Sequence, residues 1–249
     1  VLMRQATVHL RDPSGAWPAL TLRQAQVTIL NDPLPVVSVQ VQAQADGWGT
    51  VTLRARFNRL DGSLAAGVEL PACPLQAALA AWGSRVWPLG GDPWRGLNAV
   101  AAISADLTYL PQKSPAWRYD LRLELREGRF EHPDLPWPVE NLSASLLVSG
   151  QKIVVERASG EMAGATVHLS LESRSFGTEV SAPAAVSPRP ASTGRPAWLQ
   201  RLEEYLQRLE LTVQGVALED ALFQHLPHRV QELRRRFAPR GRLDLTYKY

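Results

Sequence analysis

Strict alternation of apolar and polar residues is the feature that most constrains how this chain can fold. From Val37 to Ala45 every second residue is apolar, while serine and glutamine occupy the positions between. Successive side chains of a β-strand point to opposite faces, so this segment has one apolar face and one polar face. The turn-forming sequence Asp46–Gly49 follows, and the alternation resumes from Val51 to Phe57. The pattern predicts a β-hairpin.

The same alternation recurs further along the chain, and turn signals separate the segments. Residues 119–125 alternate in this way, and Glu127-Gly128 is predicted to turn the chain after them. Residues 142–148 alternate again before a predicted turn at 149–151, and so do residues 165–171. Antiparallel sheets with one apolar face and one face in water have this pattern. The sequence therefore predicts a mainly β protein.

Both ends of the sequence fall within predicted strands, Arg4–Leu10 and Leu243–Tyr249. An unfinished strand leaves backbone groups unpaired, so we expect the chain to be a segment of a longer protein. No stretch contains the ~20 uninterrupted apolar residues of a membrane-spanning helix. No signal peptide precedes the first strand. We expect any such anchor or signal to lie in other parts of the parent chain.

A few segments depart from the alternation. Leu75–Val86 is rich in alanine and is predicted to form a short helix. Apolar residues recur at spacings of three and four from Trp198 through Leu206 to Leu209, and again from 218 to 237, which predicts helices. A proline-rich stretch without aromatic residues predicts a flexible loop. The predicted regions are a repetitive β-sheet at 1–177, the loop at 178–196 and a helical segment at 197–249 that leads into the next β repeat.

No group of residues in the sequence predicts catalysis, a metal or a cofactor. His225 and His228 have a spacing found at zinc sites, but Pro227 disrupts a regular helical face and further ligands are missing. Cys73 lies among alanines and prolines and is predicted to be a small apolar filler. The sequence shows no phosphate loop, dinucleotide fingerprint or catalytic triad. A net charge of +3 in 249 residues does not indicate nucleic-acid binding.

Two surface features have both a functional and a structural interpretation. The basic cluster Arg234, Arg235 and Arg236 could contact phosphate headgroups or an anionic membrane surface. The structural alternative is a solvated helix face. Several of the eight tryptophans adjoin proline or glycine, which suits the rims of a sheet. Carbohydrate stacking is the functional alternative for these tryptophans.

The run from Pro138 to Leu171 is the most specific part of the sequence. It combines a strand entered at Asn141, a turn at Gly150, a second alternating strand, and a step from Gly160 to Gly164 into a third strand. This run resembles the repeat of the AsmA-like superfamily, the TamB- and YhdP-like bridge-like lipid transfer proteins of the bacterial envelope. Proteins of this family are large, anchored in the inner membrane and extended across the periplasm.

The resemblance implies an extended, curved antiparallel sheet, a β-groove of taco-like repeats with a few short helices. It also implies a non-catalytic role in moving phospholipid between inner and outer membrane. The partners would be phospholipid, the membrane through parts of the parent chain not present here, and other envelope proteins, with the parent tethered to the inner membrane in the periplasm.

The groove has a clear physical rationale, but alternation alone leaves a second architecture open. Exposing each CH₂ to water costs ~0.8 kcal/mol, so two acyl chains would lose well over ~20 kcal/mol outside a groove. The same apolar faces could instead pack together in a β-sandwich that binds protein or glycan partners. The predicted lipid-groove residues are Val37, Val39, Val41, Leu121, Leu123, Leu125, Leu142, Leu146, Val148, Val167, Leu169 and Leu171.

Overall fold

The computed structural model describes residues 1–11, 19–31, 34–76, 96–132, 135, 137–149, 152–173, 206–218, 232 and 241–249. The described strands are β1 (Leu2–Leu10), β2 (Leu20–Leu30), β3 (Val36–Ala45), β4 (Gly49–Asn58), β5 (Leu64–Pro74), β6 (Leu97–Tyr109), β7 (Trp117–Phe130), β8 (Val139–Ser149), β9 (Lys152–Met162), β10 (Ala165–Ser173), β11 (Leu206–Ala217) and β12 (Arg242–Lys248).

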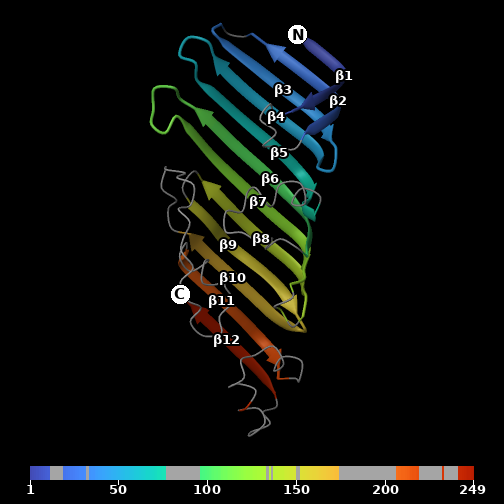
Figure 1. Ribbon diagram of the computed structural model, residues 1–249, viewed down its shortest axis with the longest axis vertical. Helices are drawn as coiled ribbons and strands as arrows, with labels where there is room; N and C mark the ends of the chain where they lie inside the picture. The colour runs from blue at the N-terminus through green and yellow to red at the C-terminus, as the bar shows by residue number, and fades with distance from the viewer. Residues whose placement is uncertain are drawn as a thin grey trace, which may run out of the picture.

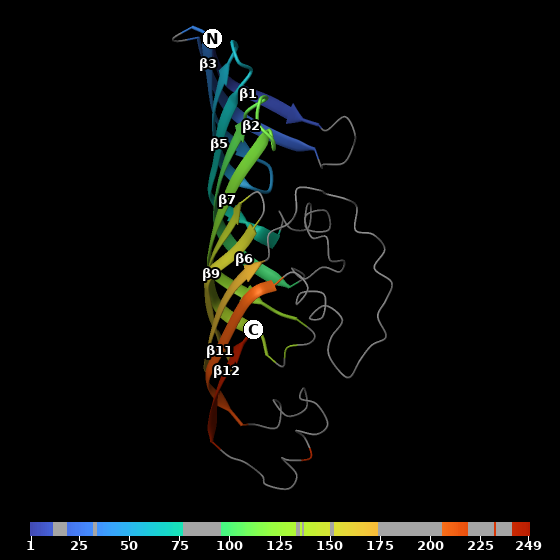
Figure 2. The same ribbon diagram turned by 90° about the vertical axis from the view of Figure 1, so that its left-hand side faces the viewer.

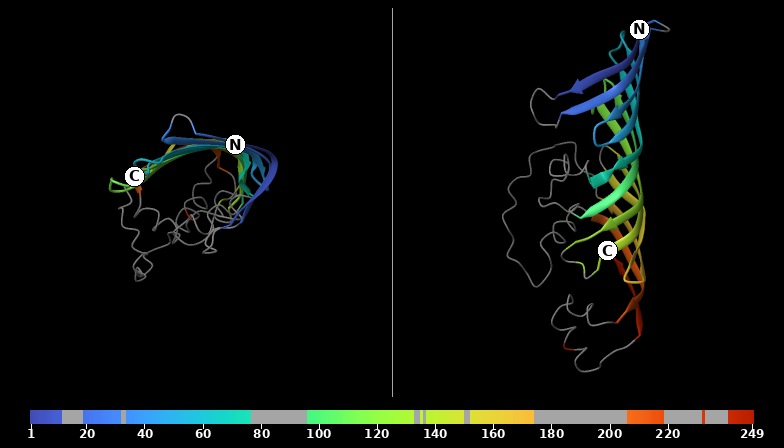
Figure 3. Two further views of the ribbon diagram at one scale, coloured as in Figure 1. Left: turned by 90° about the horizontal axis from the view of Figure 1, so that it is seen from above. Right: turned by 90° about the vertical axis from the view of Figure 1, so that its right-hand side faces the viewer.

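The twelve described strands form one open antiparallel sheet in simple sequence order. Each strand pairs with the next along the chain, so β1 and β12 are the two edge strands (Figure 1). Seen edge-on, the sheet is a single layer whose strands bend toward one side (Figure 2). Seen from above, the strands trace a shallow arc and do not close into a ring (Figure 3). The prediction of an open, mainly β antiparallel sheet is therefore confirmed.

The pairing of β3 with β4 shows how the alternation specifies the fold. Val37 pairs with Phe57, Val41 with Leu53, and Ala45 with Gly49, without a register shift. The predicted hairpin is confirmed, including its turn at 46–48. All strands among the described residues belong to this one sheet, so the two-layer β-sandwich does not describe them.

The predicted helix through Leu206 and Leu209 is wrong, because both residues lie in β11. Leu209 pairs with Leu171, and Leu206 pairs with Ser173 after a register shift. The shift inserts one extra residue, so two leucines three positions apart are both buried in a strand. A β-bulge thus produced a spacing that is otherwise typical of a helix.

The predicted turn at Glu127-Gly128 is also wrong, because β7 continues through it to Phe130. Glu127 has a φ of 52° and lies in a register shift between Leu125 and Gly128. Asn141, predicted to open a strand, lies inside β8 with a φ of 52°, again within a register shift. A bulge uses backbone conformations that also occur in turns, so the sequence signal did not separate the two.

Bulges recur along one long margin of the sheet. We call this side, where odd-numbered strands end and even-numbered strands begin, the bulged margin. Gln24 in β2, Glu127 in β7 and Gly215 in β11 have positive φ, and each falls within a register shift near it. A bulge bends its strand and increases the local twist, so the bulges along this margin contribute to the bend of the sheet.

Several predictions fall mainly outside the described residues. Only Leu75 and Gln76 of the predicted 75–86 helix are described, and the 178–196 loop is not. The pair His225 and His228 and the basic cluster of Arg234, Arg235 and Arg236 also lie outside the described residues. From the third predicted region, β11 and β12 continue the same sheet as β10.

Candidate functional site: the apolar face

Strand pairing places the apolar residues in rows that run across the sheet. Residues paired between neighbouring strands share a face, so each row can be followed from strand to strand. The longest row crosses nine strands, from β1 to β9, without a polar residue. Its members are Met3, Val27, Val41, Leu53, Val68, Ala105, Leu121, Val148 and Ile153. We call the surface to which this row belongs the apolar face.

Two parallel rows extend the apolar face toward β12. The first consists of Ile103, Leu123, Leu146, Val155, Leu171 and Leu209. The second consists of Ala101, Leu125, Ala144, Ala158, Leu169, Leu211 and Tyr247.

All twelve predicted groove residues lie on this one face. Eight of them belong to the three rows. The other four are Val37 opposite Phe57, Val39 opposite Ala55, Leu142 opposite Gly128, and Val167 opposite Val213.

The opposite surface, which we call the polar face, carries the charged and hydroxyl side chains. Ser143 and Ser159 hydroxyls hydrogen-bond across β8 and β9 at 2.9 Å. Lys248 Nζ lies 2.9 Å from Glu210 Oε1, which joins β12 to β11. This hydrogen bond and the Lys248 charge hold the pKa of Glu210 below its ordinary value. The two faces of the sheet therefore have opposite chemistry.

Many of the buried residues of the apolar face lie near the bulged margin. Ala25, Cys73 and Ala101 are fully buried. The neighbouring residue Val100 pairs with Arg126 on the polar face and is 48% exposed, whereas Ala101 is 0% exposed. At this margin the apolar face is therefore buried and the polar face is open to solvent.

Two glycines of the apolar face lie very close to neighbouring atoms. A Cβ atom at Gly160 would lie 2.6 Å from Val139 Cγ1 and 3.0 Å from the Glu140 carbonyl oxygen. A Cβ atom at Gly128 would lie 2.8 Å from Leu125 Cδ2. Atoms this close would have to shift, so neither position accommodates a side chain without local rearrangement.

The centre of the apolar face and its other margin remain partly accessible. Leu53, Leu121 and Val148 are only half-buried. At the opposite margin, Trp117 and Tyr119 are exposed, and the Tyr109 and Trp117 ring centroids lie 4.4 Å apart. The described residues provide no second sheet to cover this face. A partly exposed apolar surface of this extent is typical of a binding surface.

Cys73 is a buried apolar filler in β5, as the sequence predicted. Burial raises the pKa of its thiol, because the charged thiolate would lose solvation. The group therefore remains protonated at neutral pH and is a poor nucleophile. The described residues contain no group of histidine, cysteine and acidic side chains that could hold a metal ion.

The predicted groove residues did not include those that β11 contributes to the apolar face. Leu209, Leu211 and Val213 alternate with polar residues, which is a strand signal. The helical spacing from Trp198 to Leu209 obscured this signal.

The fold and the apolar face together define a class: an open, single-layer antiparallel β-sheet protein with one apolar and one polar face. No family model, curated protein or solved structure matches the chain. Among the described residues, no helix has the length and apolar character needed to cross a membrane.

Proposed function

We propose that this chain is a non-catalytic segment of an AsmA-like envelope protein, and that its apolar face forms a groove for phospholipid transport between the inner and outer membranes. The parent protein would lie in the periplasm, tethered to the inner membrane by other parts of its chain. The supporting observation is the uninterrupted apolar row from Met3 to Ile153 on a single open sheet.

The dimensions of the apolar face suit an acyl chain. Eight strand spacings of about 4.8 Å give the longest row a length of about 38 Å. The hydrocarbon core of a bilayer is about 30 Å thick and holds two chains end to end, so one chain needs about 15 Å. The row is therefore more than twice as long as one chain, and a lipid can occupy it at more than one position.

The chemistry of the face suits movement as well as binding. Each methylene kept from water contributes ~0.8 kcal/mol, so contact along a chain retains the lipid without specific polar bonds. The long row contains no charged residue that would fix a lipid at one point. A headgroup can remain in solvent at the accessible margin. Such a surface needs no catalytic group.

A second candidate function is an interaction module that binds a glycan or a protein. The exposed rings of Trp117 and Tyr119 favour this candidate, because aromatic rings stack on the apolar faces of sugars. These rings lie at one margin, whereas the apolar rows continue across the whole sheet, and therefore we favour the lipid groove.

Photo-crosslinking at paired positions tests the proposal. A benzophenone amino acid at Leu123, Leu146 or Leu169 should capture phospholipid in cells, because these residues lie on the apolar face. The matched controls Arg122, Ser145 and Ser170 lie on the polar face of the same strands and should capture little. Equal capture from both faces, or none from the apolar face of a functional parent protein, would reject the groove. Glycan capture at Trp117 alone would favour the second candidate.

A further inference from the structure

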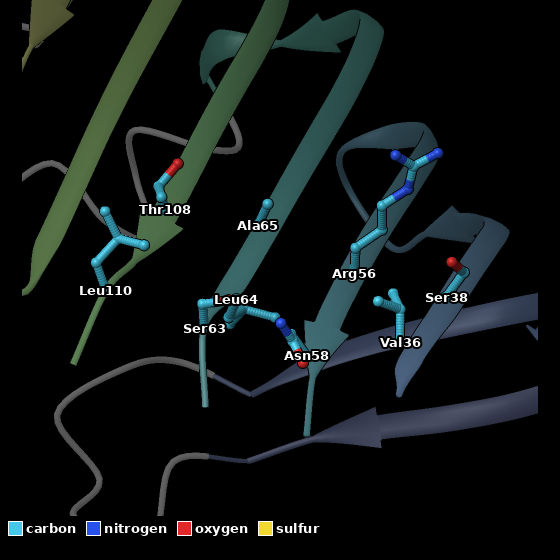
Figure 4. A pocket seen from close by; sticks show the side chains of 9 residues that line it. All are labelled: Val36, Ser38, Arg56, Asn58, Ser63, Leu64, Ala65, Thr108 and Leu110. Atoms are coloured by element: carbon cyan, nitrogen blue, oxygen red, sulfur yellow. The ribbon is translucent and has the colours of Figure 1, made fainter. Parts of the chain in front are cut away.

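A hollow lies on the polar face, where β5 turns its smallest side chains outward. Arg56 pairs with Ala65 and Ala65 with Thr108, while Arg54 pairs with Gly67 and Gly67 with Asp106. Figure 4 shows Arg56 and Thr108 on either side of Ala65. Two adjoining cavities of about 420 and 560 Å³ occupy this part of the face. Both are lined by Ser38, Arg56, Ala65 and Thr108.

One wall of the hollow is cationic. Arg54 and Arg56 are two positions apart in β4, so they point to the same face about 7 Å from each other along the strand. Neither arginine forms a salt bridge with a described residue, whereas Arg23 is bound to Asp46 and Arg129 to Glu131. Two unpaired guanidinium groups side by side repel each other and attract an anion.

The facing wall is acidic. Asp106 in β6 lies directly opposite Asp120 in β7, and like charges at such a pair are destabilising. A Cβ atom at Gly67 would lie 3.3 Å from Asp106 Oδ1, so the Asp106 carboxylate lies beside the space that Gly67 leaves open. Glu69 adds a second carboxylate to the larger cavity. None of these acidic groups forms a salt bridge within the described part of the chain.

We infer that this hollow binds a small zwitterion that carries a phosphate and a primary ammonium group a few bonds apart. The phosphate accepts hydrogen bonds from Arg54 and Arg56, and the ammonium donates to Asp106. The Cα atoms of Arg54 and Asp106 are two strand spacings apart, about 10 Å, so the two side chains can reach opposite ends of one small ligand. Binding relieves the like-charge repulsion on both walls.

The site is independent of the proposed lipid groove, because it lies on the other face of the sheet. A phosphoethanolamine unit has the required chemistry, either as a free molecule or as a lipid headgroup.

Calorimetric titration of the whole chain with three probes tests the inference. O-phosphoethanolamine should bind about tenfold more tightly than inorganic phosphate or phosphocholine, because only its ammonium can donate charged hydrogen bonds to a carboxylate. Arg56→Gln should weaken binding of all three probes about tenfold. Asp106→Asn should remove only the preference for phosphoethanolamine. Arg122→Gln changes a polar-face arginine that does not line the hollow, and should leave all three affinities unchanged.

Vesicle sedimentation distinguishes the two sources of the ligand. If the ligand is a headgroup, phosphatidylethanolamine vesicles should sediment the protein more than phosphatidylcholine vesicles, and Asp106→Asn should abolish the difference. Equal affinities for the three soluble probes without vesicle preference would overturn the inference, as would an Asp106→Asn variant, folded by circular dichroism, that keeps the preference. Binding to neither free ligand nor vesicle would overturn it too.

Discussion

Replacing Leu123 by aspartate is expected to lower phospholipid affinity by at least about tenfold. Leu123 is half-buried on the apolar face between Ile103 and Leu146. If about two acyl methylenes lose contact with the protein, the cost is ~1.6 kcal/mol, which corresponds to roughly a factor of 15 in affinity. The charged carboxylate also disfavours any remaining apolar contact. Equilibrium titration with a fluorescent phospholipid measures the effect.

The matched control for this prediction is Arg122→Asp, one residue away in the same strand. Arg122 lies on the polar face opposite Ser104, so its substitution should leave lipid affinity within about twofold. Thermal unfolding of both variants verifies that each is folded at the titration temperature. Equal loss of affinity in the two variants would contradict an apolar-face site.

Gly96→Ala is expected to cause the largest loss of stability from a single methyl group. Gly96 has a φ of 91°, and a Cβ atom there would overlap the Glu131 carbonyl oxygen. The Gly96 carbonyl also accepts a hydrogen bond from the Glu131 amide at 3.1 Å. Backbone strain of about 1–3 kcal/mol adds to an overpacking cost of about 1–3 kcal/mol. We therefore expect the free energy of unfolding to fall by about 2–6 kcal/mol in urea denaturation.

Gly164→Ala separates backbone strain from steric overlap. Gly164 has a φ of 76°, but a Cβ atom there would meet nothing within 4 Å. This variant should lose only the strain contribution, about 1–3 kcal/mol. Equal losses at the two glycines would show that the close approach of Gly96 to Glu131 contributes nothing to the stability of the sheet.

The sequence predicted the strands and their apolar face because one rule, side-chain alternation, governs both. Val37 to Phe57 gave the correct hairpin, since nothing interrupts the alternation there. The errors at Glu127 and Leu206 have one cause, a β-bulge, which shifts the phase of alternation by one residue. In the sequence alone, such a shift in the apolar–polar alternation looks like a turn or like the three-residue spacing of a helix.

The number of layers could not be derived from alternation. An apolar strand face packs equally well in a sandwich or in an open groove, so Leu123 and Leu146 alone did not distinguish the two. The hollow beside Arg56 could not be predicted from the sequence either. It depends on the register that places Ala65 and Gly67 between charged side chains on two other strands.

Native mass spectrometry after incubation with phosphatidylglycerol vesicles detects directly whether the apolar face holds phospholipid. This lipid carries no amine, so the hollow beside Asp106 should not favour it. A lipid groove should give protein ions that carry the mass of one or more phospholipids, and about tenfold fewer of them for Leu123→Asp at the same lipid concentration. A folded protein that remains free of lipid after incubation with the vesicles would contradict it.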